Sequence, residues 1–338
     1  MAQDDTILKP TRDQFRASLR ADFDGRATEA DRRILAASDH GVRDTSRRES
    51  RQMDALSDLL VQEPLERERT WVCDALIFCP LPFRPVAEKQ VVRRARTGAE
   101  EQIEVFYSAV SRASLPYGDD AFLLDLLVSQ ARKLGSPEVT FDSLKDLLRF
   151  VGVSGGGTDY KRLRERVDRI SGLHIRIERT KEVAVNIRLV DIQNIEDISN
   201  KKTQMLEGEF GQRRLLPYAF RFAPEFYDDL MRHYTVIPLQ ILRAFAGSPI
   251  EYSIARWLYR RIIHTQKPTL VRWADIHAER GGGDSNPRRI RAYARSVVQR
   301  LKVIWPGLAE AIDENHKSGL VIQRSAPPLI PDRQRIKA

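Results

Sequence analysis

The sequence predicts an α+β protein with two winged helix-turn-helix domains in tandem, preceded by a mobile charged N-terminal arm. Two observations lead to this prediction. The same order of elements, namely helix, short strand, short helix, turn, basic helix and two strands, occurs twice along the chain. A glycine triplet also stands in the same place in both copies, at 155–157 and at 281–283.

Charge and composition divide the chain into four parts. Residues 1–69 are the arm, 70–200 the first winged-helix domain, 212–325 the second, and 326–338 a basic, proline-containing tail. Residues 1–70 hold 13 basic and 15 acidic residues, whereas the rest holds 43 basic and 32 acidic ones. The arm is also poor in aromatic residues, so we expect it to be mobile. The positive excess belongs to the part that is expected to fold.

Three segments before the first repeated unit have the alternation of apolar and polar residues that is typical of half-buried strands. They span 71–78, 89–97 and 102–110. Cys73 and Cys79 lie an even number of residues apart in the first segment, so both are expected to face the core. Two cysteines in 338 residues make no disulfide framework and no metal cluster.

The first copy begins with a helix at about 119–134, which Gly135 ends. A short strand at 138–141 and a short helix at 142–150 follow. After the first glycine triplet come a basic helix at 158–171 and two strands at 173–178 and 183–190. This copy is expected to carry dimerisation and secondary DNA contact.

The second copy repeats that order. It has a long helix at about 249–264, a short strand at 269–271 and a short helix at 272–278. After the second triplet come a basic helix at 286–304 and strand candidates at 308–312 and 320–324. A flexible linker at about 193–216 is expected between the copies.

The second basic helix separates an apolar face from a basic one. At about 100° per residue, its apolar residues share one side: Ile290, Tyr293, Ala294, Val297, Leu301 and Ile304. The opposite side carries Arg288, Arg291, Ala292, Arg295, Gln299 and Lys302, with Arg289 and Arg300 beside it. No acidic residue occurs between Asn286 and Lys302, whereas a merely solvated face normally mixes both signs of charge.

This face is expected to read duplex DNA, because Arg and Gln side chains pair with guanine and adenine edges. Pro287 suits the first helical turn, and Ser285 or Asn286 can cap it. The predicted DNA-binding residues of this helix are Asn286, Arg288, Arg289, Arg291, Arg295, Gln299 and Lys302.

DNA contact is predicted less strongly for the first basic helix. Its buried face is expected to consist of Tyr160, Leu163, Val167 and Ile170. Lys161, Arg162 and Arg169 are expected to face outward as additional DNA-binding residues. Glu165 and Asp168 face the same way, so this helix is either a secondary DNA contact or partly a protein contact.

Seven short stretches between residues 75 and 325 resemble, in this order, the RepA-type initiators of plasmid replication, which are related to the two-winged-helix, iteron-binding initiators. They are Pro80-Leu81-Pro82-Phe83, Leu115-Pro116-Tyr117-Gly118, Tyr160-Lys161-Arg162-Leu163, the stretch from Phe222 to Tyr227, Ile237-Pro238-Leu239, the stretch from Leu242 to Pro249, and the stretch from Tyr252 to Leu258. The resemblance implies binding to direct repeats at a plasmid origin, opening of the duplex, and recruitment of a host replication initiator and the replicative helicase. It also implies a homodimer formed through the first domain.

Enzyme signatures are lacking in the sequence. No two histidines stand two residues apart, as a nicking replication protein would need. Neither triplet continues into the Lys-Ser or Lys-Thr of a phosphate-binding loop. The pairs Asp119-Asp120 and Asp228-Asp229 are interpreted as helix-start charges. We therefore expect a non-enzyme without cofactor or metal.

The place of the protein in the cell is also predicted. No apolar run approaches ~18 residues and no apolar signal region begins the chain, so a cytoplasmic protein without a membrane partner is expected. A sequence-specific transcriptional repressor and a partition-type DNA-binding protein remain alternatives. Only the resemblance favours the initiator.

Overall fold

The computed structural model describes residues 68–97, 101–109, 114–153, 156–180, 185–188, 190–193, 206–207, 213–214, 218–280, 286–305 and 307–326. Outside them lie the predicted arm except its last two residues, the tail except its first residue, Gly155, the triplet at 281–283 and most of the predicted linker. The described residues form an α+β fold of helices and small antiparallel sheets. The predicted fold class is confirmed at that level.

The first repeated unit contains the predicted elements in the predicted order. They are α5 (Asp120–Leu134), β4 (Glu138–Phe141), α6 (Leu144–Val151), α7 (Gly157–Ser171), β5 (Leu173–Arg179) and β6 (Val185–Arg188). Gly135 follows α5 with φ at +64°, a conformation that glycine adopts without strain. Ser143 caps α6 by accepting a hydrogen bond from the Asp146 N–H.

Two strands ahead of this unit extend its sheet. β2 (Gln90–Arg96) pairs with β3 (Gln102–Ala109), and β3 pairs with β5, so the sheet order is β2-β3-β5-β6. These two strands were predicted correctly. The segment predicted as a strand at 71–78 is instead β1 (Arg69–Cys73) followed by helix α4 (Asp74–Phe78). Both cysteines are buried as expected, but they do not share a strand.

The second unit contains α10 (Pro249–His264), β12 (Thr269–Arg272), α11 (Trp273–Arg280), α12 (Pro287–Ile304), α13 (Leu308–Ala311), β13 (Ile312–Asp313) and β14 (Gly319–Ile322). The strand predicted at 308–312 is wrong over most of its length. Leu308 and Ala311 are both buried, and a spacing of three residues brings them to the same side of a helical turn. In this segment the strand is confined to the two residues of β13, which form the sheet β12-β14-β13 with the other two strands.

A glycine is required where β14 meets β12. A Cβ atom added to Gly319 would lie only 2.0 Å from the main-chain oxygen of Val271. Any side chain would therefore separate the two strands at the start of their pairing. The absence of a side chain at Gly319 thus allows β14 to approach β12 closely.

Strand pairings connect the two units across the predicted boundary at 200–212. β10 (Tyr218–Phe222) lies between β4 and β7 (Val190–Gln193), although it falls in the range predicted for the second domain. β11 (Tyr234–Pro238) pairs with β1, and α8 (Pro224–Arg232) lies against β6. The short strands β8 (Leu206–Glu207) and β9 (Arg213–Arg214) pair with each other.

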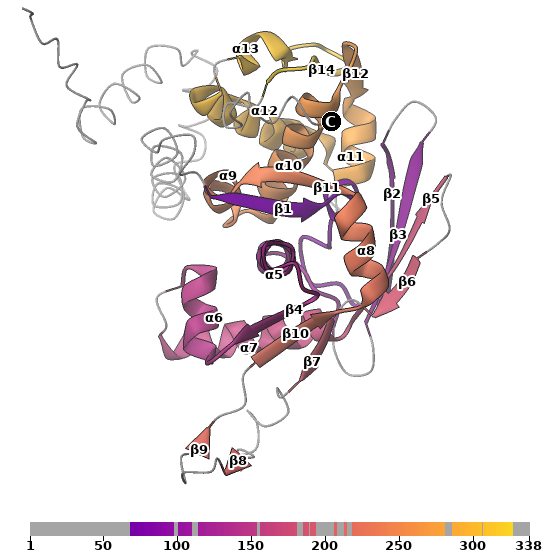
Figure 1. Cartoon of the computed structure of the whole chain (residues 1–338). Helices are drawn as coiled ribbons and strands as arrows, with labels where there is room; N and C mark the ends of the chain where they lie inside the picture. Colours follow the sequence, from indigo (N-terminus) through magenta and orange to yellow (C-terminus); the bar gives the residue numbers. More distant parts are fainter. Residues whose placement is uncertain are drawn as a thin grey trace, which may run out of the picture.

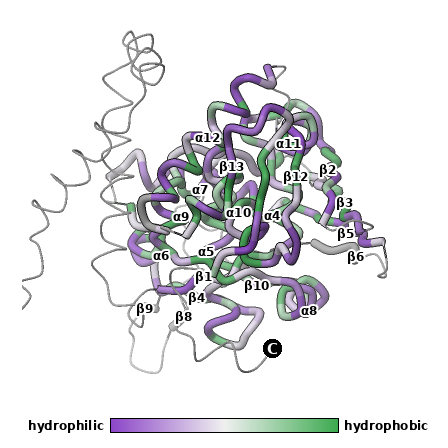
Figure 2. Tube along the Cα trace, turned by 90° about the horizontal axis from the view of Figure 1, so that it is seen from above, coloured by the Kyte–Doolittle hydropathy of each residue, from purple (hydrophilic) through white to green (hydrophobic). Residues whose placement is uncertain are grey.

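Figure 1 shows the β1–β11 pair and α9 (Leu239–Phe245) across the middle of the molecule, with α11, α12 and β14 above them and α6, α7 and β4 below. A single hydrophobic cluster includes residues of both units, among them Leu127 of α5 and Trp257 of α10. Hydrophobic and hydrophilic residues alternate along α11 and α12 (Figure 2), as expected of helices with one buried face. The units therefore share one core.

Candidate nucleic-acid interface

Helix α12 starts with the predicted cap. The side chain of Asn286 accepts a hydrogen bond from the Arg288 N–H at 3.0 Å, and Pro287 occupies the first helical position. Asn286 is thus a capping residue of the helix. Its place at the N-terminus, which carries partial positive charge, also suits a neighbouring phosphate.

The two faces of α12 are largely those that the spacing predicts. Its buried residues are Ile290, Ala294, Val297, Val298 and Leu301, and Tyr293 packs partly buried beside them. Its exposed residues include Arg288, Arg289, Ala292, Arg295 and Gln299. The side chain of Ile304 lies outside the described residues. The helix packs on α10 and α11, and its outward surface is basic. The sequence of the helix contains no acidic residue.

Arg291 is turned further toward the protein than predicted. It is half-buried, and its guanidinium lies 5.1 Å from the ring centroid of Trp273 on α11. At this distance the cation attracts the ring, and the stacking holds the side chain near α11. Arg291 therefore supports the helix pair at the margin of the basic surface.

The C-terminal half of the basic stripe meets a buried acid. Glu314, which is 3% exposed, follows β13 in the turn before β14. Its carboxylate accepts hydrogen bonds from Nζ of Lys302, at 2.7 Å to each oxygen, and from Nε2 of Gln299. Its main-chain oxygen accepts from Nε of Arg295 at 3.3 Å. The stripe predicted to face DNA therefore also holds the turn at 314–318.

This contact changes the role of Lys302. Its ammonium group is paired with a buried carboxylate and its side chain is only 22% exposed. The prediction that it lies on the open basic face is therefore wrong. The positive charges that remain exposed on α12 are those of Arg288, Arg289 and Arg295.

Helix α7 buries Leu163, Val167 and Ile170, as predicted, with Tyr160 packed partly buried against the core. Lys161 and Arg162 are exposed, and so are Glu165 and Asp168. The outward face of α7 thus mixes both signs of charge. Its electrostatic attraction for a phosphate backbone is weaker than that of α12.

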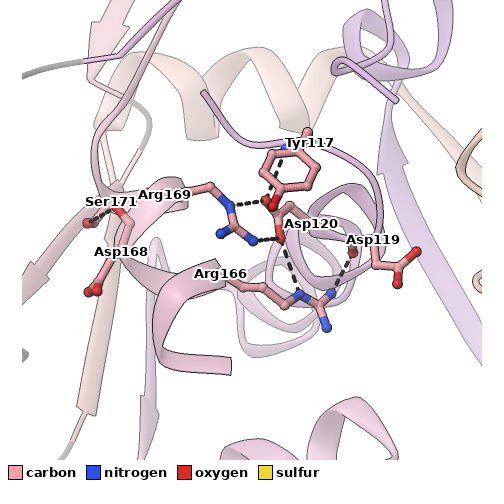
Figure 3. A network of polar contacts seen from close by, with 7 residues as sticks. All are labelled: Tyr117, Asp119, Asp120, Arg166, Asp168, Arg169 and Ser171. Carbon is pink, nitrogen blue, oxygen red and sulfur yellow. Dashed lines mark hydrogen bonds and ion pairs between the residues drawn. The ribbon is translucent and has the colours of Figure 1, made fainter. Parts of the chain in front are cut away.

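Arg169 does not face outward, contrary to the prediction. Its guanidinium donates from Nε and Nη2 to the two carboxylate oxygens of Asp120, at 2.7 and 3.0 Å, and lies 4.5 Å from the ring centroid of Tyr117. Arg166 donates to the same carboxylate at 3.2 Å. Figure 3 shows both arginines converging on Asp120, which is 1% exposed. The pairing ties α7 to the start of α5 and removes Arg169 from the open surface.

Sequence reasoning missed the acidic partners. Asp120 does stand in the first turn of α5, as the helix-start interpretation has it, but it is buried and paired with arginines 46 and 49 residues away. Asp229 lies in the second half of α8, where it accepts from Arg179 at 2.5 and 3.0 Å, so the helix-start interpretation of Asp228-Asp229 is wrong. The sequence of α12 shows only that the helix itself contains no acidic residue.

Within the described residues, no helix combines the length and the apolar character that a membrane span requires. The same residues contain no cluster of three histidine, cysteine, aspartate or glutamate side chains arranged to hold a metal ion.

No protein-family model and no curated protein sequence matches this chain. A crystal structure of domain 2 and domain 3 of RctB is similar to this chain, with a TM-score of 0.45 and 11% sequence identity. The similar region covers 68% of this chain and 85% of the RctB chain. A second crystal structure, of RctB domains 2–3, has a TM-score of 0.41 and 10% sequence identity to this chain. Its similar region covers 70% of this chain and 83% of the RctB chain. With TM-scores below 0.5, neither likeness supports an assignment of function.

Proposed function

We propose that the chain is a non-enzymatic replication initiator that binds duplex DNA at direct repeats of a plasmid origin. One observation carries the DNA-binding part, namely the N-terminal half of α12. This segment presents Arg288, Arg289 and Arg295 on an exposed face of a helix whose sequence contains no acid. A helix about 10–12 Å wide fits the major groove, and arginine side chains there contact phosphates and guanine edges.

In this proposal each unit acts as a winged helix. In the second unit α11 and α12 are the helix-turn-helix, and the sheet β12-β14-β13 is the wing. In the first unit α6 and α7 take the same parts, with β5 and β6 as the wing. The second unit makes the main DNA contact because its helix is free of acid.

The first unit is proposed to have two uses. On a direct repeat, Lys161 and Arg162 contact DNA beside the second unit, so one chain covers about 20 base pairs, or two major-groove faces. In a dimer the first unit pairs with a second chain and the molecule binds an inverted repeat. The monomer would serve initiation, with a host replication initiator and the replicative helicase as partners, and the dimer would serve repression.

The choice of initiator over repressor depends on the resemblance to RepA-type proteins. Both functions require sequence-specific binding through α12, so the residues of that helix do not distinguish them. A repressor would bind its operator without opening it. An initiator would also make thymines in a neighbouring A·T-rich segment reactive to permanganate.

The test uses the full chain and duplexes from the DNA beside its gene. Direct repeats of about two helical turns should bind at least a hundredfold more tightly than a scrambled duplex of the same length. The logarithm of the binding constant should fall by about 0.9 for each phosphate neutralised, per tenfold rise in salt. Equal affinity for the repeats and the scrambled duplex would refute sequence-specific binding. Specific binding without permanganate reactivity on a supercoiled origin would favour the repressor.

A further inference from the structure

Two exposed side chains of α12 are held by one residue that is itself buried. Arg295 and Gln299 lie four residues apart, so they neighbour each other on one side of the helix. Both bind Glu314, Arg295 to its main-chain oxygen and Gln299 to its carboxylate. Glu314 is anchored independently by Lys302 and by its burial. The two exposed side chains therefore share one rigid support.

The hydrogen bond to Glu314 determines which atoms Arg295 presents to solvent. The bond uses Nε, and within the described part of the chain Nη1 and Nη2 make no hydrogen bond. These two nitrogens form a fork of parallel donors. A fork of this kind matches the O6 and N7 acceptors of guanine in the major groove. The orientation of the Arg295 guanidinium therefore suits hydrogen bonding to a guanine.

The carboxylate of Glu314 also determines the orientation of the Gln299 amide. An ionised carboxylate only accepts hydrogen bonds, so the amide nitrogen must face Glu314 and the amide oxygen must face away. One proton of Nε2 binds Glu314. The other proton and Oε1 form a donor and acceptor pair, which matches N7 and the N6 amino group of adenine. The orientation of the Gln299 amide therefore suits hydrogen bonding to an adenine.

We propose that Glu314 is a positioning residue for sequence reading. It fixes Arg295 to read a guanine and Gln299 to read an adenine within about two base pairs of it. Residues four apart on a helix are separated by about 6 Å, and stacked bases by about 3.4 Å. Fixing both side chains before binding removes the rotamer entropy that DNA binding would otherwise cost. This inference rests on the proposed function, because it takes α12 to enter a major groove.

The experiment enriches bound duplexes from a pool with 25 randomised base pairs, with sequencing of the bound fraction. The proteins are the full-length chain, Glu314→Gln, Arg295→Ala, Gln299→Ala and the control Glu310→Gln. Glu310 is exposed on α13, four residues before Glu314. The full-length chain should enrich a motif with guanine and adenine within about two base pairs. Arg295→Ala should lose only the guanine preference, and Gln299→Ala only the adenine preference.

Glu314→Gln removes the ion pair with Lys302 that anchors the turn, and this turn carries both the main-chain oxygen bound by Arg295 and the side chain bound by Gln299. Both preferences should therefore weaken, each by about tenfold, while the control keeps both. The affinity of Glu314→Gln for an unrelated duplex should stay within threefold of the unmodified chain. Equal weakening of binding to every duplex by a folded Glu314→Gln protein would overturn the positioning role. Unchanged preferences in Glu314→Gln would overturn it as well.

If Glu314→Gln fails to fold, Glu314→Asp takes its place. It keeps the charge opposite Lys302 but shortens the side chain, so the adenine preference should fall and the fold should persist. A wild-type adenine preference in a folded Glu314→Asp protein would contradict the proposal. Enrichment of no motif by the unmodified chain would refute the proposed function itself. A motif that neither Arg295→Ala nor Gln299→Ala alters would refute only the role of Glu314.

Discussion

The guanidinium of Arg256 donates from Nη1 to the carboxylate of Asp125 at 2.5 Å, and both side chains are at most 2% exposed. Asp125 lies on α5 of the first unit and Arg256 on α10 of the second. The hydroxyl of Tyr252 donates to the same carboxylate oxygen, also at 2.5 Å. Burial raises the pKa of Asp125, and the charge of Arg256 opposes that shift. The two units are thus joined by a buried ion pair.

Replacing one partner of this pair should destabilise the protein strongly. Asp125→Leu should lower the free energy of unfolding by about 3–5 kcal/mol, because it leaves Arg256 charged and without its anion. Combining it with Arg256→Met should recover most of that loss. Denaturant unfolding measures both. Glu138→Ala, which breaks the exposed pair with Arg221, is the control and should cost less than about 1 kcal/mol. A double variant as unstable as Asp125→Leu would contradict this account.

The exposed N-terminal arginines of α12 should set the salt dependence of DNA binding. Arg288→Ala and Arg289→Ala should each weaken binding to all duplexes and reduce the salt slope by about one. Titrations at several salt concentrations measure the slope. Arg232→Ala, an exposed position on α8, should leave it unchanged. An unchanged slope in both variants would place the phosphate contacts elsewhere.

The first unit should extend the footprint on a direct repeat. Replacing Lys161 and Arg162 with alanine should shorten protection from about 20 to about 10 base pairs, since each unit covers one major-groove face. Hydroxyl-radical footprinting, with light scattering to fix the number of chains bound, measures this. Protection of only about 10 base pairs by the unmodified chain, unchanged by the two substitutions, would show that the second unit binds alone.

Asp120 should influence stability and DNA affinity in opposite directions. Asp120→Asn removes the charge that pairs with Arg166 and Arg169, so it should lower stability by about 1–3 kcal/mol. The same change leaves two arginines of α7 unneutralised, so binding to non-specific duplex should strengthen. Asp228→Asn, an exposed change on α8, should do neither. Loss of stability without a gain in affinity would mean that the freed arginines do not reach DNA.

The N-terminal segment should be dispensable for DNA binding. A chain that begins at Glu63 keeps β1 and the hydrogen bond from the Leu239 N–H to the Glu68 oxygen, and should bind origin repeats within a few-fold of the full chain. A chain that begins at Asp74 lacks β1 and its pairing with β11, and should unfold at a lower temperature. A hundredfold loss of affinity in the longer of these chains would assign the segment to the DNA interface.

The elements whose pattern is local could be predicted from the sequence. The apolar and basic faces of α12 follow from a spacing of three and four residues, and Asn286 and Pro287 mark its start. The helices of both units except α13, and strands β2 and β3, were visible for the same reason. Burial of one face selects side chains at a fixed period, and this period is written in consecutive residues.

Which of those basic residues are exposed to solvent depends instead on contacts between distant segments. Arg169 and Lys302 have the spacing of outward residues, yet Asp120 and Glu314 approach them from other segments. The pairing of β1 with β11 and the insertion of β10 beside β4 likewise join residues far apart in the chain. Such contacts depend on how whole elements pack, and packing leaves no periodic signal in either segment. The positions of the basic residues could be predicted from the sequence, but their partners could not.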